Sequence, residues 1–377
     1  MRTFCESNTG VTINLDTYKR NLKKITDFVG PSVKVMAVVK ANAYGHGMVE
    51  CAQTAVESGI PMLGVAFASE GIELRNAGIE SPILVMAQES ADNFQCMIDN
   101  HLTVTISSYD MLFHLKEALV SKNTFCRVHI KVDTGMGRGG VRVEDALELV
   151  DHAGKIKGVV VEGVYSHFSS ADERDSTFSQ KQITSFRTFI ESLSNKRQLP
   201  PITHMCNSSA TLNYPSAHFN LVRIGLLSYG LFPSPVSSTK LQVEPVLSWN
   251  STITYIKDVP KGTPVSYGRT YITKRPSRVA VVPAGYAHGY RRHLSNKGYG
   301  IVKGKKVPII GLICMDQTVF DITDAGDVLC GDTITLLGKN GSERISAEDL
   351  ATTVGTICYE IVTGITSRVP RTFIKTT

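Results

Sequence analysis

The sequence has few of the features that would place the chain in a membrane or in an oxidising compartment. It contains no apolar stretch of 18 residues, the length that a transmembrane helix needs. The N-terminus, MRTFCESNTG, lacks the apolar core of a signal peptide. The eight cysteines are scattered without a CxxC pair, which argues against a disulfide framework and against a zinc site. We therefore expect reduced thiols, no bound metal and a cytoplasmic protein.

The sequence also lacks the clustered positive charge that nucleic-acid binding requires. The net charge is +6 over 377 residues, and the sequence has neither a long Lys/Arg run nor a basic patch interleaved with aromatic residues. The hydrophobic content of 42% and charged content of 20% are typical of a globular protein with a large core. At this length two domains are expected, and the mild positive charge is compatible with an anionic small ligand.

Residues 33–230 repeat one pattern, in which a short apolar run is in most cases followed by a segment of helical period. The runs are continuous rather than alternating, as in the buried strands of a parallel sheet. The expected strands are 33–39, 61–67, 82–87, 102–107, 125–132, 159–166, 202–206 and 219–224. The expected helices include 48–58, 69–77, 108–120, 143–153 and 173–194. Eight such units predict a closed (β/α)8 barrel. A doubly wound open sheet is the alternative, disfavoured because no GxGxxG follows the first strand.

The pattern changes near residue 240, so we expect one domain over residues 1–240 and a second over 241–377. Strand-like runs separated by tight turns such as GKNGS fill the second part, which predicts a mainly antiparallel β domain. One helix is expected there at 346–354, with Ser346 as its N-cap. The stretch VTINLD (11–16) precedes the first barrel helix, and together with residues 1–16 it packs either with the barrel or with the second domain.

The stretch KVMAVVKANAYGHG (34–47) places Lys40 at the C-terminal end of the first long apolar strand, the end at which barrels gather their functional groups. The simpler interpretation is a lysine that extends into water. Partial desolvation would instead favour the neutral, nucleophilic amine that Schiff-base chemistry needs. Tyr44 and the Gly45-His46-Gly47 turn then follow, where a hydroxyl and free amides could meet an anion. The residues alone leave both interpretations open.

AVVKANAYGHG resembles the pyridoxal-phosphate lysine motif of the alanine racemases. Further segments similar to that family follow in order: KVDTGMGRGG (131–140), YSHFSSADE (165–173), HMCNSSATL (204–212), VRIGLLSYG (222–230), VSYGRTY (265–271), GYAHGY (285–290), GLICMDQ (311–317) and CYEIVTGITSRVPR (358–371). The resemblance implies a barrel followed by a β domain, the cofactor pyridoxal 5'-phosphate, and a homodimer with shared active sites. It also implies the interconversion of L-alanine and D-alanine, which supplies D-alanine for peptidoglycan.

The resemblance also implies which residues hold the cofactor. They are Lys40 as the Schiff-base lysine, with Tyr44, His167, Asn207, Ser208, Arg223, Gly225, Leu226 and Tyr359. In the family the arginine faces the pyridine nitrogen, where many related enzymes have a carboxylate, and the histidine hydrogen-bonds that arginine. Because arginine has no acceptor, it cannot stabilise a protonated ring nitrogen, which limits side reactions. Asn207 and Ser208 also suit a helix N-cap, and both roles are compatible.

Racemisation needs a base on each face of a planar carbanion. The resemblance assigns these roles to Lys40 and Tyr267, and a nearby cation would have to tune the phenol. It assigns substrate binding to Arg138, Met315 and Asp316, an often carbamylated position to Lys131, and the entrance channel to Tyr286. One departure is His288, because GYAHG stands where the family usually has GYADG. That puts the charge and gating of the channel in doubt.

The sequence disfavours three rival functions. A broader racemase, acting on serine or larger amino acids, is disfavoured because Tyr359 matches a residue that crowds the side-chain pocket of alanine-specific members. A related barrel decarboxylase would need C-terminal substrate motifs that are not found. A non-catalytic pyridoxal-phosphate-binding protein would be a single barrel, whereas this chain has residues 241–377 and Tyr267.

Overall fold

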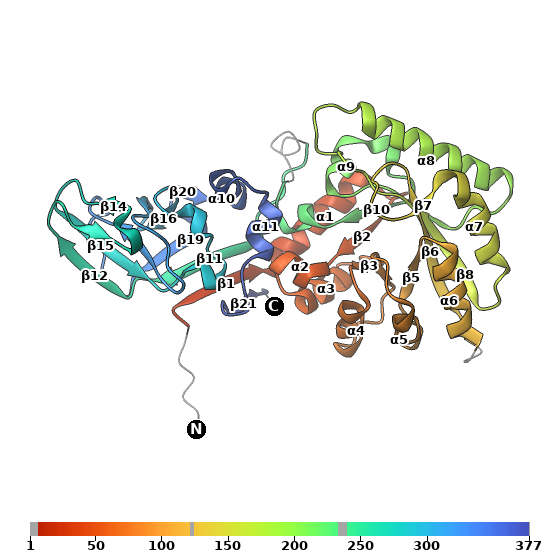
Figure 1. Cartoon of the computed structure of the whole chain (residues 1–377), viewed down its shortest axis with the longest axis horizontal. Helices are drawn as coiled ribbons and strands as arrows, with labels where there is room; N and C mark the ends of the chain where they lie inside the picture. Colours follow the sequence, from red (N-terminus) through yellow and green to blue (C-terminus); the bar gives the residue numbers. More distant parts are fainter. Residues whose placement is uncertain (1–6, 121–123, 233–239, 377) are drawn as a thin grey trace, which may run out of the picture.

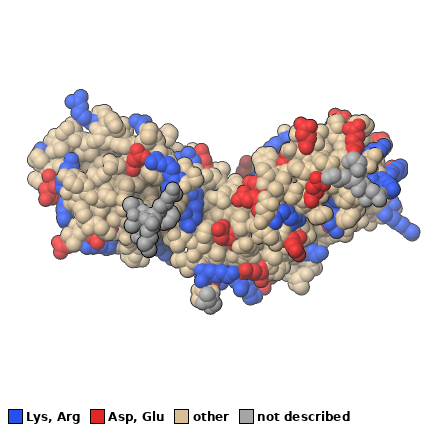
Figure 2. Space-filling model, turned by 90° about the horizontal axis from the view of Figure 1, so that it is seen from below, with Lys and Arg blue, Asp and Glu red and all other residues tan. Residues whose placement is uncertain are grey.

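The computed structural model describes residues 7–120, 124–232 and 240–376, which form two bodies along the long axis of the molecule (Figure 1). One body is a parallel barrel surrounded by helices, and the other is built mainly of antiparallel strands. Lysine and arginine are interspersed with acidic residues on the face seen in Figure 2, without a continuous basic stripe on that face. In the parts of the chain that are described, no helix has the length and apolarity to span a bilayer.

Eight parallel strands close the barrel. They are β2 (Lys34–Val38), β3 (Met62–Val65), β4 (Ile83–Val85), β5 (Thr103–Ile106), β6 (Cys126–Asp133), β8 (Val159–Tyr165), β9 (Ile202–His204) and β10 (Leu221–Ile224). Each strand pairs with the next, and β10 pairs back to β2, so no edge is left open. Each strand coincides with or overlaps one of the predicted apolar runs. The predicted (β/α)8 barrel is therefore confirmed, and the open-sheet alternative is wrong.

Helices cover the outside of the barrel. They are α1 (Leu15–Val29), α3 (Met48–Glu57), α4 (Ala68–Asn76), α5 (Phe94–Asp99), α6 (Tyr109–Val120), α7 (Val143–Lys155), α8 (Thr177–Asn195) and α9 (Ser208–Asn213). In α7 the buried residues Ala146, Leu149, Val150 and Ala153 recur at helical spacing and form one apolar stripe against the strands. Both α5 and α9 have only six residues, too few for a helical period to show in the sequence.

The second body contains three sheets and two helices. Its strands are β11 (Leu247–Thr252), β12 (Tyr255–Val259), β13 (Pro264–Val265), β14 (Tyr271–Ile272), β15 (Ser277–Val282), β16 (Tyr299–Val302), β17 (Lys305–Pro308), β18 (Thr318–Asp321), β19 (Thr333–Asn340), β20 (Glu343–Ile345) and β21 (Arg371–Ile374). Nearly all of their pairings are antiparallel, as predicted. The helices are α10 (Ala347–Val354) and α11 (Cys358–Thr363). Ser346 caps α10 as predicted, because its side chain accepts a hydrogen bond from the Asp349 amide at 3.1 Å.

The N-terminal strand ties the two bodies together. β1 (Thr9–Asn14) pairs antiparallel with β11 and parallel with β21, so it lies in the largest sheet of the second body. It continues directly into barrel helix α1, where Asn14 Oδ1 accepts from the Thr17 amide at 2.8 Å and caps the helix. Residues 1–6 lie outside the described part of the chain.

Candidate active site

A cavity of about 470 Å³ opens at the C-terminal end of the barrel strands. All nine predicted cofactor residues line it, together with Arg138 and Lys131; the nine are Lys40, Tyr44, His167, Asn207, Ser208, Arg223, Gly225, Leu226 and Tyr359. Strand geometry explains this convergence, because alternate side chains of a barrel strand point inward. Met36 belongs to the apolar cluster inside the barrel, and Lys40 lies four residues further along the same chain. Leu221 belongs to the same cluster, and Arg223 follows it by two residues along β10. Both spacings are even, so Lys40 and Arg223 lie on the inward-facing side of the barrel.

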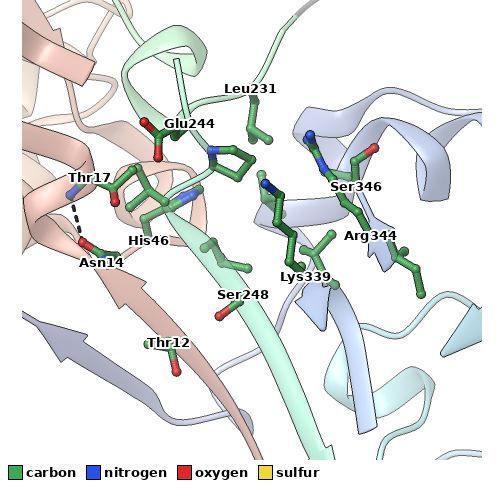
Figure 3. Close-up of a pocket in the computed structure, with 18 of the residues that line it drawn as sticks. Thr12, Asn14, Thr17, His46, Leu231, Glu244, Ser248, Lys339, Arg344 and Ser346 are labelled. Atoms are coloured by element: carbon green, nitrogen blue, oxygen red, sulfur yellow. Dashed lines mark hydrogen bonds between the residues drawn. The ribbon is translucent and has the colours of Figure 1, made fainter. Parts of the chain in front are cut away.

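A second cavity, of about 360 Å³, lies where the two bodies meet (Figure 3). Residues of β1, β11, β19 and α10 line it, with His46 on its barrel side. Its charged residues, Glu244, Lys339 and Arg344, are exposed, and none of the predicted site residues is among its lining. The groups suited to chemistry therefore gather in the barrel cavity.

Lys40 begins a turn of unusual backbone conformation, α2 (Lys40–Gly45). Residues 41–44 have φ angles between 52° and 55°, which makes one turn of left-handed helix without a glycine. Such a conformation costs about 1–2 kcal/mol for each residue with a Cβ, so surrounding contacts must hold it. The sequence KANAY gave little sign of this turn, because it contains no glycine, and of its four residues with positive φ only Asn42 is of a type that often adopts a left-handed conformation.

Two side chains hold the left-handed turn. Glu70, in the first turn of α4, accepts from the Ala41 amide through Oε1 at 2.6 Å and from the Ala66 amide through Oε2 at 2.7 Å. His46 Nδ1 lies 3.0 Å from the carbonyl oxygens of both Ala43 and Tyr44, so this nitrogen must donate. Burial lowers the pKa of His46 to about 4, which keeps the ring neutral. The turn that presents Lys40 is thus fixed from both sides.

The cavity lowers the pKa of both lysines that line it. Burial lowers the pKa of Lys40, the charges of Arg138 and Arg223 lower it further, and Glu70 opposes them. The same causes, burial first and then Arg138 and Arg223, lower the pKa of Lys131 to about 8. Both lysines are therefore easier to convert to the neutral, nucleophilic amine than a lysine in water.

Donor groups form a cradle at the ends of β9 and β10. The amides of Gly225 and Leu227 lie 3.2 and 3.3 Å from Ser208 Oγ. A Cβ on residue 225 would lie 2.3 Å from the hydroxyl of Tyr44, so only glycine fits there. Burial raises the pKa of Tyr44 and of Tyr359, which keeps both phenols as hydrogen-bond donors. Hydroxyls and amides of this kind fit the phosphate group of the predicted pyridoxal 5'-phosphate.

Arg223 lies fully surrounded by protein at the base of the cavity. Its Nη2 donates to the carbonyl oxygens of Ser166 and Met205 and lies 2.9 Å from His167 Nδ1. Its Nη1 lies 2.9 Å from His204 Nδ1. All four partners of the guanidinium are neutral groups. Burial lowers the pKa of Arg223 to about 10, so the guanidinium still carries its positive charge near neutral pH.

Two histidines and a glutamate near Arg223 were missed from the sequence. His204 Nε2 lies 2.8 Å from His129 Nδ1, and His129 Nε2 lies 3.4 Å from Glu162 Oε2. The signal was present, because His129 and Glu162 interrupt the apolar runs FCRVHIKV and VVVEGVYS. A single polar residue in a strand cannot be separated from an ordinary buried group without the pairing partner.

Four predicted site residues lie in the second body and do not reach the barrel cavity. Tyr267 begins a short turn before β14 and is 73% exposed, and Met315 is 54% exposed. Tyr286 is also exposed, and Asp316 pairs with Arg368 at 2.8 Å. Figure 1 shows β14 at the end of the molecule away from the barrel. One chain by itself therefore does not bring Tyr267 to Lys40.

His288 occupies the position where the resembling family usually has aspartate. It is buried, and its Nδ1 accepts from the Gly285 amide at 3.2 Å. Burial lowers the pKa of His288, Arg368 lowers it further and Asp316 opposes them. The ring is thus held neutral, and this loop beside Tyr286 lacks the negative charge of the usual aspartate.

Comparisons with known proteins agree along the whole chain. The family model for the N-terminal domain of alanine racemase matches residues 13–233, and the model for the C-terminal domain matches residues 246–373. An alanine racemase of Halothermothrix orenii is 41% identical over 97% of this chain and 96% of its own. A crystal structure of alanine racemase from D-cycloserine-producing Streptomyces lavendulae has a TM-score of 0.94 at 36% identity, covering 99% of both chains. Another, from Bartonella henselae with covalently bound pyridoxal phosphate, has a TM-score of 0.86 at 26% identity, covering 98% of this chain and 100% of that one.

Proposed function

Because this chain belongs to the alanine racemase family and interconverts L-alanine and D-alanine, we propose that its chemistry takes place in the barrel cavity with pyridoxal 5'-phosphate bound covalently to Lys40. The observation that carries this proposal is the position of Lys40, whose pKa burial lowers, in a cavity that also holds a cradle of hydroxyls and backbone amides. When bound, the cofactor withdraws electrons from Cα of the amino acid and makes its proton acidic.

The remaining cavity residues then have distinct tasks. Ser208, Tyr44, Tyr359 and the amides of Gly225 and Leu226 hold the phosphate, with Asn207 fixing the loop through its bond to the Ala210 amide at 2.9 Å. Arg223, oriented by His167, donates to the ring nitrogen. Because a guanidinium gives up no proton near neutral pH, it leaves the ring a weaker electron acceptor than a carboxylate partner would. A proton returned to Cα is then favoured over transfer elsewhere.

Two bases exchange the Cα proton. Lys40 would be the base on one face, where its amine removes or returns the Cα proton. Tyr267 of the partner subunit serves the other face, because the phenol of the same chain is exposed and remote from Lys40. Met315 and Asp316 of the partner subunit, with Arg138, bind the substrate carboxylate, and the partner's Tyr286 lines the entrance. We thus propose a homodimer in which each site is complete only with residues of both chains.

Lys131 is proposed to carry a carbamate. Its pKa of about 8 provides a neutral amine, which adds to carbon dioxide and loses a proton to give an anionic carbamate. That negative charge would lie among the cations that lower the pKa of Lys131, of which Arg138 has the largest effect. The carbamate would orient the guanidinium of Arg138 for the substrate carboxylate.

Substrate range and cellular role are part of the same proposal. Tyr359 lines the cavity and is held by ring contact with Tyr44, with centroids 6.0 Å apart, and we propose that its ring limits the space for a substrate side chain larger than methyl. We expect D-alanine to be the physiological product, supplied to peptidoglycan synthesis in the cytoplasm.

A chiral assay over a panel of amino acids tests the proposed function. The purified chain with pyridoxal 5'-phosphate should racemise alanine from either enantiomer and reach an equal mixture. Serine and larger amino acids should react far more slowly, because one additional heavy atom in a tight pocket costs roughly 10- to 200-fold in specificity. Equal rates with serine and alanine would instead support the broader racemase.

A further inference from the structure

A row of buried polar groups crosses the barrel interior beneath the cofactor cavity. Arg223 Nη1 lies 2.9 Å from His204 Nδ1, His204 Nε2 lies 2.8 Å from His129 Nδ1, and His129 Nε2 makes a longer contact of 3.4 Å with Glu162 Oε2. Both histidines are fully buried, whereas the Glu162 side chain is 19% exposed and lies 3.4 Å from Arg127 Nε. We call Arg223, His204, His129 and Glu162 the barrel relay.

The relay runs away from the cofactor cavity. Arg127 is the second residue of β6, so it lies at the strand end opposite the cavity. Lys34, whose charge also acts on Glu162, is the first residue of β2. The carboxylate therefore faces solvent at the opposite mouth of the barrel from Lys40.

Arginine fixes the direction of every hydrogen bond in the relay. Arg223 can only donate, so His204 Nδ1 must be without a proton and must accept. A neutral His204 then carries its proton on Nε2 and donates to His129 Nδ1. His129 must likewise carry its proton on Nε2 and donate to Glu162, the one obligate acceptor of the row. Each ring thus has a single permitted tautomer.

The charge states required for this order agree with the surroundings. Burial lowers the pKa of His204 and of His129, and Arg223 lowers both further. The hydrogen bond and charge of Glu162 oppose this at His129, but its pKa still lies below the usual value, so both rings are neutral near neutral pH. Burial alone would raise the pKa of Glu162, but the hydrogen bond from His129 and the charges of Arg127 and Lys34 together hold it below its usual range. An anion at one end and a cation at the other are thus separated by two neutral rings.

Two backbone features of β8 make room for the relay. Val128 pairs with Val161 and His129 pairs with Gly163, so Glu162 is the additional residue of a β-bulge. A bulge redirects a side chain that would otherwise continue the strand alternation. At Gly163 an added Cβ would lie 2.7 Å from His129 Nδ1, so only glycine accepts the ring there. A barrel needs neither feature for closure, and both bring His129 against Glu162.

We propose that Glu162 and His129 are positioning residues for racemisation. Through the tautomer of His204 they hold the Arg223 guanidinium in a single orientation, as a donor toward the cofactor cavity. The idea rests on the proposed function, because the cofactor ring is what responds to the orientation of Arg223. Of the four relay residues, only Arg223 lines the cofactor cavity.

The consequence of breaking the relay follows from the tautomers. Without the acceptor at residue 162, His129 is free to move its proton to Nδ1, and His204 must then carry a proton on its own Nδ1. Two donors, the Nδ1–H of His204 and the Nη1–H of Arg223, would then face each other without an acceptor between them. The guanidinium would therefore turn away. The ring nitrogen could then gain a proton from water and draw electrons more strongly. A bound cofactor would then act more often as a two-electron oxidant of alanine: it would take up the amino group and be reduced to its amine form, while water supplies the oxygen of the pyruvate released.

Three variants test the proposal in the holoenzyme. Glu162→Leu removes the acceptor, whereas Glu162→Gln keeps one oxygen that can accept from His129. Glu117→Leu is the matched control, because Glu117 Oε2 makes the same 3.4 Å contact with a ring nitrogen of His114 on the exposed helix α6. Glu162→Leu should lower kcat about tenfold, as loss of an outer partner does at metal sites, with little change in KM. It should also raise the pyruvate formed per racemisation, and the other two variants should remain near wild type.

A measurement that needs no turnover accompanies the kinetics. Nitrogen-15 NMR of histidine-labelled wild-type protein should show His129 and His204 both protonated on Nε2, and Glu162→Leu should shift His204 toward Nδ1. Equal behaviour of Glu162→Leu and wild type in kcat and pyruvate ratio would overturn the proposal. So would a proton on His204 Nδ1 in the wild type, a result that decides the matter even if Glu162→Leu fails to fold. Failure of the proposed function would show separately, as a wild-type protein without racemase activity.

Discussion

At the scale of single residues, the cavity concentrates positive charge. Lys40, Lys131, Arg138 and Arg223 all line it, and their mutual repulsion adds to burial in lowering the pKa of both lysines. An anionic ligand relieves that repulsion, and pyridoxal 5'-phosphate with an amino acid brings a phosphate and a carboxylate. The positive charge of the cavity thus favours an anionic ligand such as pyridoxal 5'-phosphate, which the resemblance predicted.

The first prediction concerns Lys40 alone. The purified protein should be yellow, and borohydride should fix the cofactor covalently to Lys40, as peptide mass mapping would show. Lys131, whose pKa is also lowered, is the internal comparison in the same cavity and should remain free of the adduct. A reduced adduct on any lysine other than Lys40 would contradict the assignment.

A second prediction separates the two faces of the reaction. Tyr267→Phe should keep bound cofactor and lose racemisation by about 10²- to 10⁴-fold, the usual contribution of a general acid or base. Lys40 alone should still exchange the Cα hydrogen of D-alanine with deuterated water, which NMR can follow. Tyr255→Phe, at another exposed tyrosine of the same body, is the control. Racemisation by Tyr267→Phe at the wild-type rate would refute the two-base scheme.

His288 gives a prediction about stability and pH. Its folded pKa lies below its unfolded value, so below about pH 6.5 the unfolded chain binds the additional proton and stability falls as the pH falls. His288→Asp keeps an acceptor for the Gly285 amide and removes this titration. Urea unfolding at several pH values should show that the variant loses less stability between pH 7 and pH 5, by at most about 1.4 kcal/mol per pH unit. An identical pH dependence of the two proteins would count against the neutral, accepting His288.

At the scale of elements, the left-handed turn after β2 stores backbone strain beside Lys40. Its four residues with positive φ would relax if their polar contacts were lost, and Lys40 would move with them. Glu70 supplies the contact that joins the turn to the end of β3, since its two carboxylate oxygens accept from the amides of Ala41 and Ala66. We call these two hydrogen bonds of Glu70 the clamp, and their contribution to stability can be measured separately from racemisation.

Glu70→Gln should weaken the clamp, because an amide has one acceptor oxygen and its NH2 group would face a backbone N–H. These hydrogen bonds are exposed or half-buried, so loss of one should cost about 0.5–1.5 kcal/mol; the melting temperature should fall accordingly and added cofactor should bind more weakly. Glu73→Gln on the exposed side of α4 is the matched control. Unchanged melting temperature and cofactor affinity in Glu70→Gln would show that the turn is held by other contacts.

Elements differ in how far the sequence could predict them. The barrel strands were predictable because strands buried on both faces leave continuous apolar runs, and Ser346 was predictable because capping is local. The left-handed turn was not, since KANAY carries no glycine and depends on Glu70 from another element. The β-bulge at Glu162 was also hidden, because a bulge appears only against the register of the neighbouring strand. The candidate site residues were found through motif resemblance, and spacing alone would have left Lys40 ambiguous.

At the scale of the whole molecule, the chain separates the groups that the reaction must bring together. Lys40 lines the barrel cavity, whereas Tyr267 is exposed in the other body, which β1 and the main sheet hold apart from the barrel. A large rearrangement within one chain would have to break the pairing of β1 with β11 and β21. A second copy supplying Tyr267 requires no such change.

Mixing two inactive variants tests this arrangement. Lys40→Ala and Tyr267→Phe homodimers should each be nearly inactive, because every site then contains one lesion. After co-refolding in equal amounts, about half of the dimers should be mixed if the chains assort at random. A mixed dimer has one site with both lesions and one site with neither, so activity should return to roughly a quarter of the wild-type value. Refolding each variant alone is the control. If both residues of a site came from the same chain, no mixture would contain an intact site, and the co-refolded sample would stay as inactive as its parents.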